Sequence, residues 1–149
     1  SFNNTRMICR LIDERFPDYE NVIPVENTKS MKVNRADFLN SLKRISIYAN
    51  KTTHQVRLKI NGSELQISAE DLDFSNEANE KMACEFVGDD IEIGFNAKFL
   101  MEMVNNLDSA DLTLKLSEPN RAGLLIPEDA DENEDVLMLV MPVMLNSYT

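Results

Sequence analysis

Asn34-Arg35-Ala36-Asp37-Phe38-Leu39 and Asn96-Ala97-Lys98-Phe99-Leu100 are two similar stretches, the second one residue shorter, and each opens a segment with helical periodicity. Asn suits the N-cap because its side chain accepts a hydrogen bond from an otherwise unpaired backbone amide. The predicted helices run over residues 35–50 and 97–107, and similar strands follow at 56–60 and 112–116. We interpret this as an internal duplication of a strand, a helix and a run of antiparallel strands. It predicts an α+β fold, with two helices packed on one face of antiparallel sheets.

Alternating and β-branched residues predict the strands around these helices. They fall at about residues 7–12, 55–60, 64–69, 82–87, 91–94, 112–116, 123–126 and 136–143. Asn61-Gly62 lies between the second and third of them and predicts a tight hairpin. Residues 1–29 lie outside both copies, so we interpret them as the end of a preceding domain and a linker. Residues 30–149 then form the duplicated domain.

The overall composition of the chain limits which classes of function are expected. The chain has 149 residues, a net charge of −11, a single histidine (His54) and two cysteines, Cys9 and Cys84, without metal-binding spacing. Because the chain begins at Ser1, we expect it to be part of a longer protein. No stretch has the ~18 apolar residues of a membrane span, so cytoplasmic residence is expected. Two buried, reduced thiols are favoured over a disulfide.

Residues for catalysis are scarce, so we do not expect an enzyme or a bound cofactor. With 4 glycines, the chain cannot build a glycine-rich phosphate loop, and the sequence shows no GxSxG or HExxH. Carboxylates gather at Glu70, Asp71 and Asp73 and in the run 128–135. Either group offers oxygen ligands to a hard cation. A turn after a strand and a solvated loop are the favoured interpretations, and no metal site is expected.

A helical wheel assigns the faces of both helices. The inward stripes consist of Phe38, Leu42, Ile45 and Ala49 in the first helix, and of Leu100, Met103, Val104 and Leu107 in the second. Lys43, Arg44 and Lys98 point outward in an acidic chain. From the sequence pattern alone, we interpret these outward helix faces as ordinary solvent-exposed surfaces. Ile47 and Tyr48 lie off the core stripe at the end of the first helix, which suits either packing under a loop or a subunit contact.

The C-terminal stretch Val140-Met141-Pro142-Val143-Met144-Leu145 is apolar and interrupted by proline. Proline forfeits a ladder hydrogen bond, so Pro142 predicts an edge or an exit from the sheet. Met144 and Leu145 should then lie near the surface, where methionine suits contacts with varied peptides. A last strand that closes the core is the alternative.

Three motifs in the same order resemble bacterial DNA sliding clamps, the beta subunit of DNA polymerase III. They are Leu11-Ile12-Asp13-Glu14-Arg15-Phe16-Pro17-Asp18-Tyr19, Ile91-Glu92-Ile93-Gly94-Phe95-Asn96, and Val140-Met141-Pro142 with Val143-Met144-Leu145. The resemblance covers essentially the whole chain. It implies that residues 1–29 end the second clamp domain and that residues 30–149 form the third.

In this family, two subunits of three domains each close into a ring around duplex DNA and give the replicative polymerase its processivity. The resemblance implies that Lys43, Arg44 and Lys98 face DNA phosphates without reading sequence. It also implies that Ile47 and Tyr48 contribute to the homodimer interface of the full-length ring, and that the protein has no membrane partner.

The family docks short Gln-Leu-x-Leu-Phe peptides of the DNA polymerase III alpha subunit, the clamp loader and repair proteins in a hydrophobic cleft. The resemblance places the cleft residues at Pro17, Asn21 and Val22 and at Val140, Met141, Pro142, Val143 and Met144. Asn21 stands where some members have a basic residue, and residues 146–149 extend past the usual end. Both departures bear on peptide preference.

Two other hypotheses stay open. One is a stand-alone peptide-binding interaction module with the same fold, which a complete gene without upstream domains would favour. The other is a metal-dependent enzyme built on the carboxylate clusters, which stabilisation by calcium or magnesium would favour.

Overall fold

The computed structural model describes residues 4–129 and 133–145. Its helices are η1 (Tyr19–Val22, 3-10), α1 (Arg35–Ile45), η2 (Ser46–Tyr48, 3-10) and α2 (Ala97–Asn105). Its strands are β1 (Lys29–Asn34), β2 (Gln55–Asn61), β3 (Glu64–Asp71), β4 (Asn76–Ala83), β5 (Glu85–Val87), β6 (Ile91–Asn96), β7 (Asp111–Leu116), β8 (Gly123–Pro127) and β9 (Met138–Val140). The predicted α+β class is confirmed.

The strands form two antiparallel sheets, ordered β5-β1-β7-β8-β9 and β4-β3-β2-β6. The duplication is visible as two units, β1-α1-β2-β3-β4 and β6-α2-β7-β8-β9. Each unit contributes its first strand to the sheet of the other, since β1 pairs with β7 and β6 pairs with β2. This exchange joins the two halves of the chain into one folded body.

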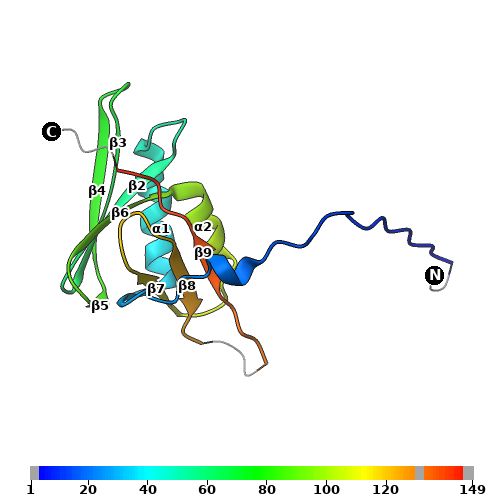
Figure 1. The fold of residues 1–149 in the computed structure, drawn as a ribbon. Coiled ribbons are helices and arrows are strands. Elements are labelled where there is room, and N and C mark those ends of the chain that lie inside the picture. Colours follow the sequence, from blue (N-terminus) through cyan, green and yellow to red (C-terminus); the bar gives the residue numbers. More distant parts are fainter. Residues whose placement is uncertain (1–3, 130–132, 146–149) are drawn as a thin grey trace.

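The helices lie side by side and contact both sheets, rather than one face of a single sheet (Figure 1). Both predicted N-caps are confirmed: Asn34 accepts from the amide of Asp37 at 3.1 Å, and Asn96 accepts from that of Lys98 at 3.0 Å. The first helix is shorter than predicted, because it ends at Ile45 and continues as η2.

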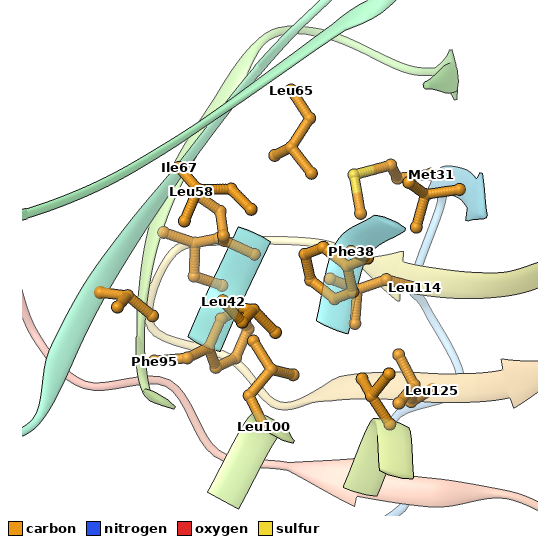
Figure 2. Packing of buried hydrophobic residues seen from close by; sticks show 14 of the residues in the cluster. Met31, Phe38, Leu42, Leu58, Leu65, Ile67, Phe95, Leu100, Leu114 and Leu125 are labelled. Atoms are coloured by element: carbon orange, nitrogen blue, oxygen red, sulfur yellow. The ribbon is translucent and has the colours of Figure 1, made fainter. Parts of the chain in front are cut away.

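The core lies between the helices and the two sheets. Figure 2 shows Phe38 and Leu42 of α1 and Leu100 of α2 pointing into a space also filled by strand residues. The strand residues in that view include Leu58, Ile67, Leu114 and Leu125. Phe38, Leu42 and Leu100 are fully buried, so the inward stripes are confirmed at these positions. Removal of such side chains typically costs about 2–5 kcal/mol of stability.

Several predicted strand boundaries were wrong. Residues 7–12 form no ladder and are exposed, because a strand needs a partner and none of the described residues supplies one. The segment extends away from the folded body (Figure 1). The predicted strand 82–87 is two strands that belong to different sheets, and the last strand stops at Val140 instead of Val143.

Two strands, the hairpin turn and one cysteine also differ from the prediction. β1 and the first part of β4 were not predicted at all. The hairpin turn consists of Gly62 and Ser63, one position later than expected, with Gly62 at φ 58°. Both cysteines are free as expected, but Cys9 is exposed instead of buried. No helix within the described ranges is long and apolar enough to cross a membrane.

Candidate functional site

The C-terminal segment crosses from one sheet to the other. After β9, Val143 forms an isolated antiparallel bridge with Gly94 of β6, and its amide donates to the Gly94 carbonyl at 2.9 Å. Pro142 therefore marks an exit from the sheet, as predicted. Met141 and Met144 are 63% and 71% exposed, whereas Val140 is buried. The segment thus holds its backbone fixed while it presents two methionines to solvent.

Gly94 makes this crossing possible. A Cβ atom on Gly94 would lie 2.7 Å from the carbonyl oxygen of Val143 and 2.8 Å from Cδ2 of Leu145. Both distances are shorter than van der Waals contact allows, so only glycine lets the C-terminal segment approach β6 this closely. The sequence motif that contains Gly94 did not predict this structural role.

The N-terminal part of the predicted cleft is ordered by its own hydrogen bonds. The Tyr19 amide donates to the Pro17 carbonyl at 3.0 Å, and the Asn21 side-chain amide donates to Asp18 at 2.7 Å. Phe16 and Tyr19 stack edge to face, with centroids 6.2 Å apart. Val22 is 62% exposed. Among the described residues, no hydrogen bond joins this segment to the C-terminal one, so the assembled cleft stays a prediction.

Phe99 is an exposed aromatic residue that the sequence analysis missed as a surface feature. It lies in the first turn of α2 and is 63% exposed. Helix α2 contacts β9, and the C-terminal segment bridges to Gly94, two residues before the α2 N-cap. Phe99 therefore adds an aromatic side chain to the apolar surface at this end of α2.

The three predicted DNA-facing cations do not behave alike. Lys43 and Lys98 are exposed on α1 and α2, and neither forms an ion pair within the part of the chain described. Arg44 instead binds Glu80 of β4, with its Nε donating to Oε2 at 3.1 Å. The hydrogen bond to Arg44 lowers the pKa of Glu80, and the same contact raises the pKa of Arg44. Arg44 thus ties α1 to the edge of a sheet.

Ile47 and Tyr48 are exposed as expected, by 65% and 43%. Leu72 and Phe74, in the β3–β4 turn, are exposed by 63% and 69%, and η2 contacts both strands that flank this turn. We call these four residues the end patch. It lies beside β4, an outer strand of its sheet. Leu72 and Phe74 were not predicted from the sequence, because their place beside η2 depends on the packing of η2 against β3 and β4.

The carboxylate cluster begins in the last two residues of β3, Glu70 and Asp71, and orders the turn that follows. Asp71 is buried, and its Oδ1 accepts from the Asp73 amide at 3.1 Å. Asn50 donates to Asp71 and to Asp73 at 3.4 Å each, which connects the loop after η2 to the turn. Glu128, at the start of the acidic run, accepts from Thr113 and pairs with Lys32 at 3.5 Å. Residues 130–132 of this run and the tail 146–149 lie outside the described residues.

Two exchanged β-α-β-β-β units with a bridged, partly exposed C-terminal segment form the domain architecture of the sliding clamps. A sliding clamp of Pseudomonas aeruginosa superposes with a TM-score of 0.85 at 29% identity, over 91% of this chain and 36% of that one. A sliding clamp of Bartonella birtlesii gives a TM-score of 0.83 at 31% identity, over 90% of this chain and 35% of that one. Both of those structures contain griselimycin.

Sequence comparison agrees with the structural one. Beta sliding clamps of Vibrio cholerae and Pseudomonas putida are 29% and 31% identical over 96% and 91% of this chain. The chain spans 38% and 36% of their lengths. The family model of the DNA polymerase III beta subunit, C-terminal domain, matches residues 20–144. The chain belongs to this family.

Proposed function

We propose that this chain is the third domain of a ring-forming, non-catalytic sliding clamp that gives the replicative DNA polymerase processivity. The observation that carries the proposal is the C-terminal segment, in which a fixed backbone presents Met141 and Met144 to solvent in a member of the clamp family. Exposed apolar anchors on an ordered backbone suit the docking of short hydrophobic peptides.

The proposed cleft combines this segment with Pro17, Asn21 and Val22. Phe99 extends the apolar surface from α2. The expected ligands are Gln-Leu-x-Leu-Phe peptides of the DNA polymerase III alpha subunit, the clamp loader and repair proteins. Because two relatives were solved with griselimycin, we extend binding of that compound to the protein that contains this chain.

The DNA-facing role rests on Lys43 and Lys98, whose exposed ammonium groups are free to meet phosphates. Such contacts are independent of sequence and weaken as salt concentration rises. Because the side chain of Arg44 is bound to Glu80, Arg44 contributes less to DNA binding than the two lysines do. Of the 26 acidic residues, Asp37 and Glu102 lie on α1 and α2 and the others lie outside these two helices, which is compatible with a DNA partner at a net charge of −11.

Closure of the homodimer ring is proposed at the end patch. Ile47 and Tyr48 supply the apolar surface already expected, Leu72 and Phe74 enlarge it, and β4 offers unpaired backbone groups to a strand of the other subunit. An exposed edge next to apolar side chains is typical of a protein interface.

The test is fluorescence anisotropy of a labelled Gln-Leu-x-Leu-Phe peptide titrated with the full-length parent protein. We expect saturable binding that competes with griselimycin and collapses in a folded Pro142→Ala, Met144→Ala variant. Val87→Ala, which removes an equally exposed apolar side chain on β5, is the matched control and should bind normally. A folded parent that binds neither ligand would contradict the docking function.

A stand-alone peptide-binding module is the second candidate. It is favoured by the acidic balance of the chain and by the loss of Arg44 to an internal ion pair. The two candidate functions predict different behaviour on circular DNA. Retention of the full-length parent on a circle, followed by its release when the circle is cut, would favour the clamp over the stand-alone module. A clamp slides off the linear product, whereas a module without DNA function is not retained on either form.

A further inference from the structure

A small polar cavity lies where the chain enters β1, next to the β7–β8 turn. Its volume is about 190 Å³. The lining consists of two cations, two carboxylates and two hydroxyl groups, from Lys29, Arg121, Glu26, Glu118, Thr28 and Ser117. We call it the turn cavity. It shares no residue with the proposed peptide cleft, the end patch, α1 or α2, so none of the functions proposed above uses it.

The turn that forms one wall of this cavity is held in place by Asn27. The side-chain amide of Asn27 donates to the carbonyl of Lys115 at 3.0 Å and to that of Ala122 at 3.1 Å. These two carbonyls lie on either side of the β7–β8 turn, so one side chain closes the turn at its base. Ser117 is the first residue after β7 and therefore has a fixed position before any ligand binds.

The hydroxyl group of Ser117 is buried and has no hydrogen-bond partner within the described residues. Buried polar groups are nearly always paired, because an unpaired one lowers the stability of the fold. A hydroxyl group can rotate its hydrogen toward whichever acceptor is offered. Ser117 is thus a hydrogen-bond donor that the cavity holds ready for a ligand.

Lys29 supplies a positive charge whose position is constrained by the backbone. A Cβ atom on Gly88 would lie 2.8 Å from Cγ of Lys29 and 3.1 Å from its Cβ, and Gly88 has a φ of 131°. Only glycine at this position lets the stem of Lys29 lie where it does. In the described part of the chain, neither Lys29 nor Arg121 forms an ion pair, although Glu26 and Glu118 line the same cavity.

The groups with constrained positions determine which ligand fits. Lys29 and Ser117 are half-buried, whereas Arg121, Glu26 and Glu118 are exposed, so both carboxylates can turn toward solvent. An ammonium group and a hydroxyl group are both donors, and converging donors suit an oxyanion through charge-assisted hydrogen bonds. The guanidinium group of Arg121 adds a planar set of donors that matches phosphate. We propose that the turn cavity binds the phosphate group of a small molecule, either free phosphate or a nucleotide.

The first test is isothermal titration calorimetry of the full-length parent protein with inorganic phosphate, adenosine monophosphate and adenosine at constant ionic strength. We expect saturable binding of the two phosphate compounds and none of adenosine. Equal affinities for the two phosphate compounds would assign the cavity to free phosphate, and tighter binding of adenosine monophosphate would assign it to a nucleotide. Equal binding of adenosine and adenosine monophosphate would overturn the proposal. Heats that never saturate with phosphate would overturn it too, since they indicate an adventitious ion only.

Three variants separate this site from general attraction of phosphate to lysine. Ser117→Ala should weaken phosphate binding about tenfold. It should leave the thermal midpoint unchanged or raise it, because the lost hydroxyl group has no partner among the described residues. Lys29→Gln should weaken binding as well, whereas Lys115→Gln, which removes the same charge on β7 outside the lining, should bind like the parent. Unchanged affinity in Ser117→Ala, or equal losses in the two lysine variants, would contradict a built site.

Gly88→Ala moves Lys29 without removing any charge. The new methyl group would overlap the stem of Lys29, so phosphate binding should weaken although every charged group is kept. Gly62→Ala is the matched control, because Gly62 also has a positive φ but a Cβ there meets nothing within 4 Å. It should bind phosphate like the parent. Normal phosphate binding by a folded Gly88→Ala variant would show that the placement of Lys29 does not matter, and the proposed site would fail.

Discussion

The two helices of the duplication bury equivalent positions in the core, but they expose different side chains to solvent. Counted from the N-caps without a gap, Phe38 corresponds to Leu100, Leu42 to Val104 and Ile45 to Leu107, and all six are buried. The corresponding partner of Phe99 is therefore Asp37, not Phe38. The sequence alignment, which paired the two phenylalanines through a one-residue gap, was wrong. The core positions are therefore apolar in both units, whereas the exposed first-turn position is aromatic in α2 and acidic in α1.

The ends of the two units differ as well. After the first unit, β5 returns to β1, the first strand of that unit, and forms a three-residue ladder with it. The C-terminal segment returns to β6 in the same way, but with one bridge, at Gly94. Lys32 and Gly94 occupy equivalent positions, each two residues before an N-cap, and Lys32 pairs with Glu85 of β5. A segment held by a single bridge keeps its side chains available, which suits the proposed docking role of the second unit.

Replacement of the two phenylalanines should give the greatest contrast in stability. Phe38→Ala should lower the free energy of unfolding by about 3–5 kcal/mol, because it empties a fully buried site. Phe99→Ala should change it by only about 0.5 kcal/mol, because the side chain is 63% exposed. Urea denaturation of both variants measures the difference. Equal losses would restore the gapped alignment and place Phe99 in the core.

Sequence reasoning succeeded where the signal is local. The N-caps, the inward stripes and the hairpin depend on residues within one turn or one ladder, and each was predicted, the hairpin turn one position too early. It failed where the structure depends on distant partners. The inner face of β4 is only half-buried, so its sequence has no strong apolar alternation, and residues 7–12 have alternation but no described partner. The role of Arg44 was missed for the same reason, since Glu80 comes from a strand that was itself not predicted.

The next largest effect concerns the single bridge of the C-terminal segment. Gly94→Ala should cost about 1–3 kcal/mol, because the new methyl group overlaps a backbone oxygen that cannot move without breaking the bridge. It should also weaken Gln-Leu-x-Leu-Phe binding by the full-length parent, since Met141 and Met144 shift with the backbone. Gly62→Ala is the control: its Cβ meets nothing within 4 Å, although its φ of +58° causes local strain. We expect lower stability in both variants and weaker peptide binding in Gly94→Ala alone. Unchanged peptide binding in Gly94→Ala would show that the segment tolerates the shift.

A smaller effect is expected from the caps, which are equivalent in the two units. Asn34 also donates to the carbonyl of Ala110, before β7, at 3.2 Å, and Asn96 donates to that of Thr53, before β2, at the same distance. Each cap thus ties its helix to the loop that follows the other helix. Asn34→Ala and Asn96→Ala should each cost about 1 kcal/mol in thermal or urea unfolding. A much larger loss for one of them would show that the two units are not equally stabilised.

The smallest effect distinguishes how the two helices are fixed to their sheets. The side chain of Arg44 in α1 binds Glu80 of β4, whereas the side chain of Asn106, the equivalent residue after α2, donates to the carbonyl of Glu102 within its own helix. Because the folded protein lowers the pKa of Glu80, the stabilisation from this contact is present above the unfolded pKa of about 4.3 and is lost as pH falls through the folded pKa. Glu80→Gln should therefore destabilise slightly at pH 7 and less at pH 3, with a loss much smaller than that of Phe38→Ala. Unfolding of the parent and the variant at both pH values measures this, and Asn106→Ala, which removes no charge, should show no such dependence. A Glu80→Gln loss that persists undiminished at pH 3 would assign the contact to packing, and α1 and α2 would then be anchored by the same kind of interaction.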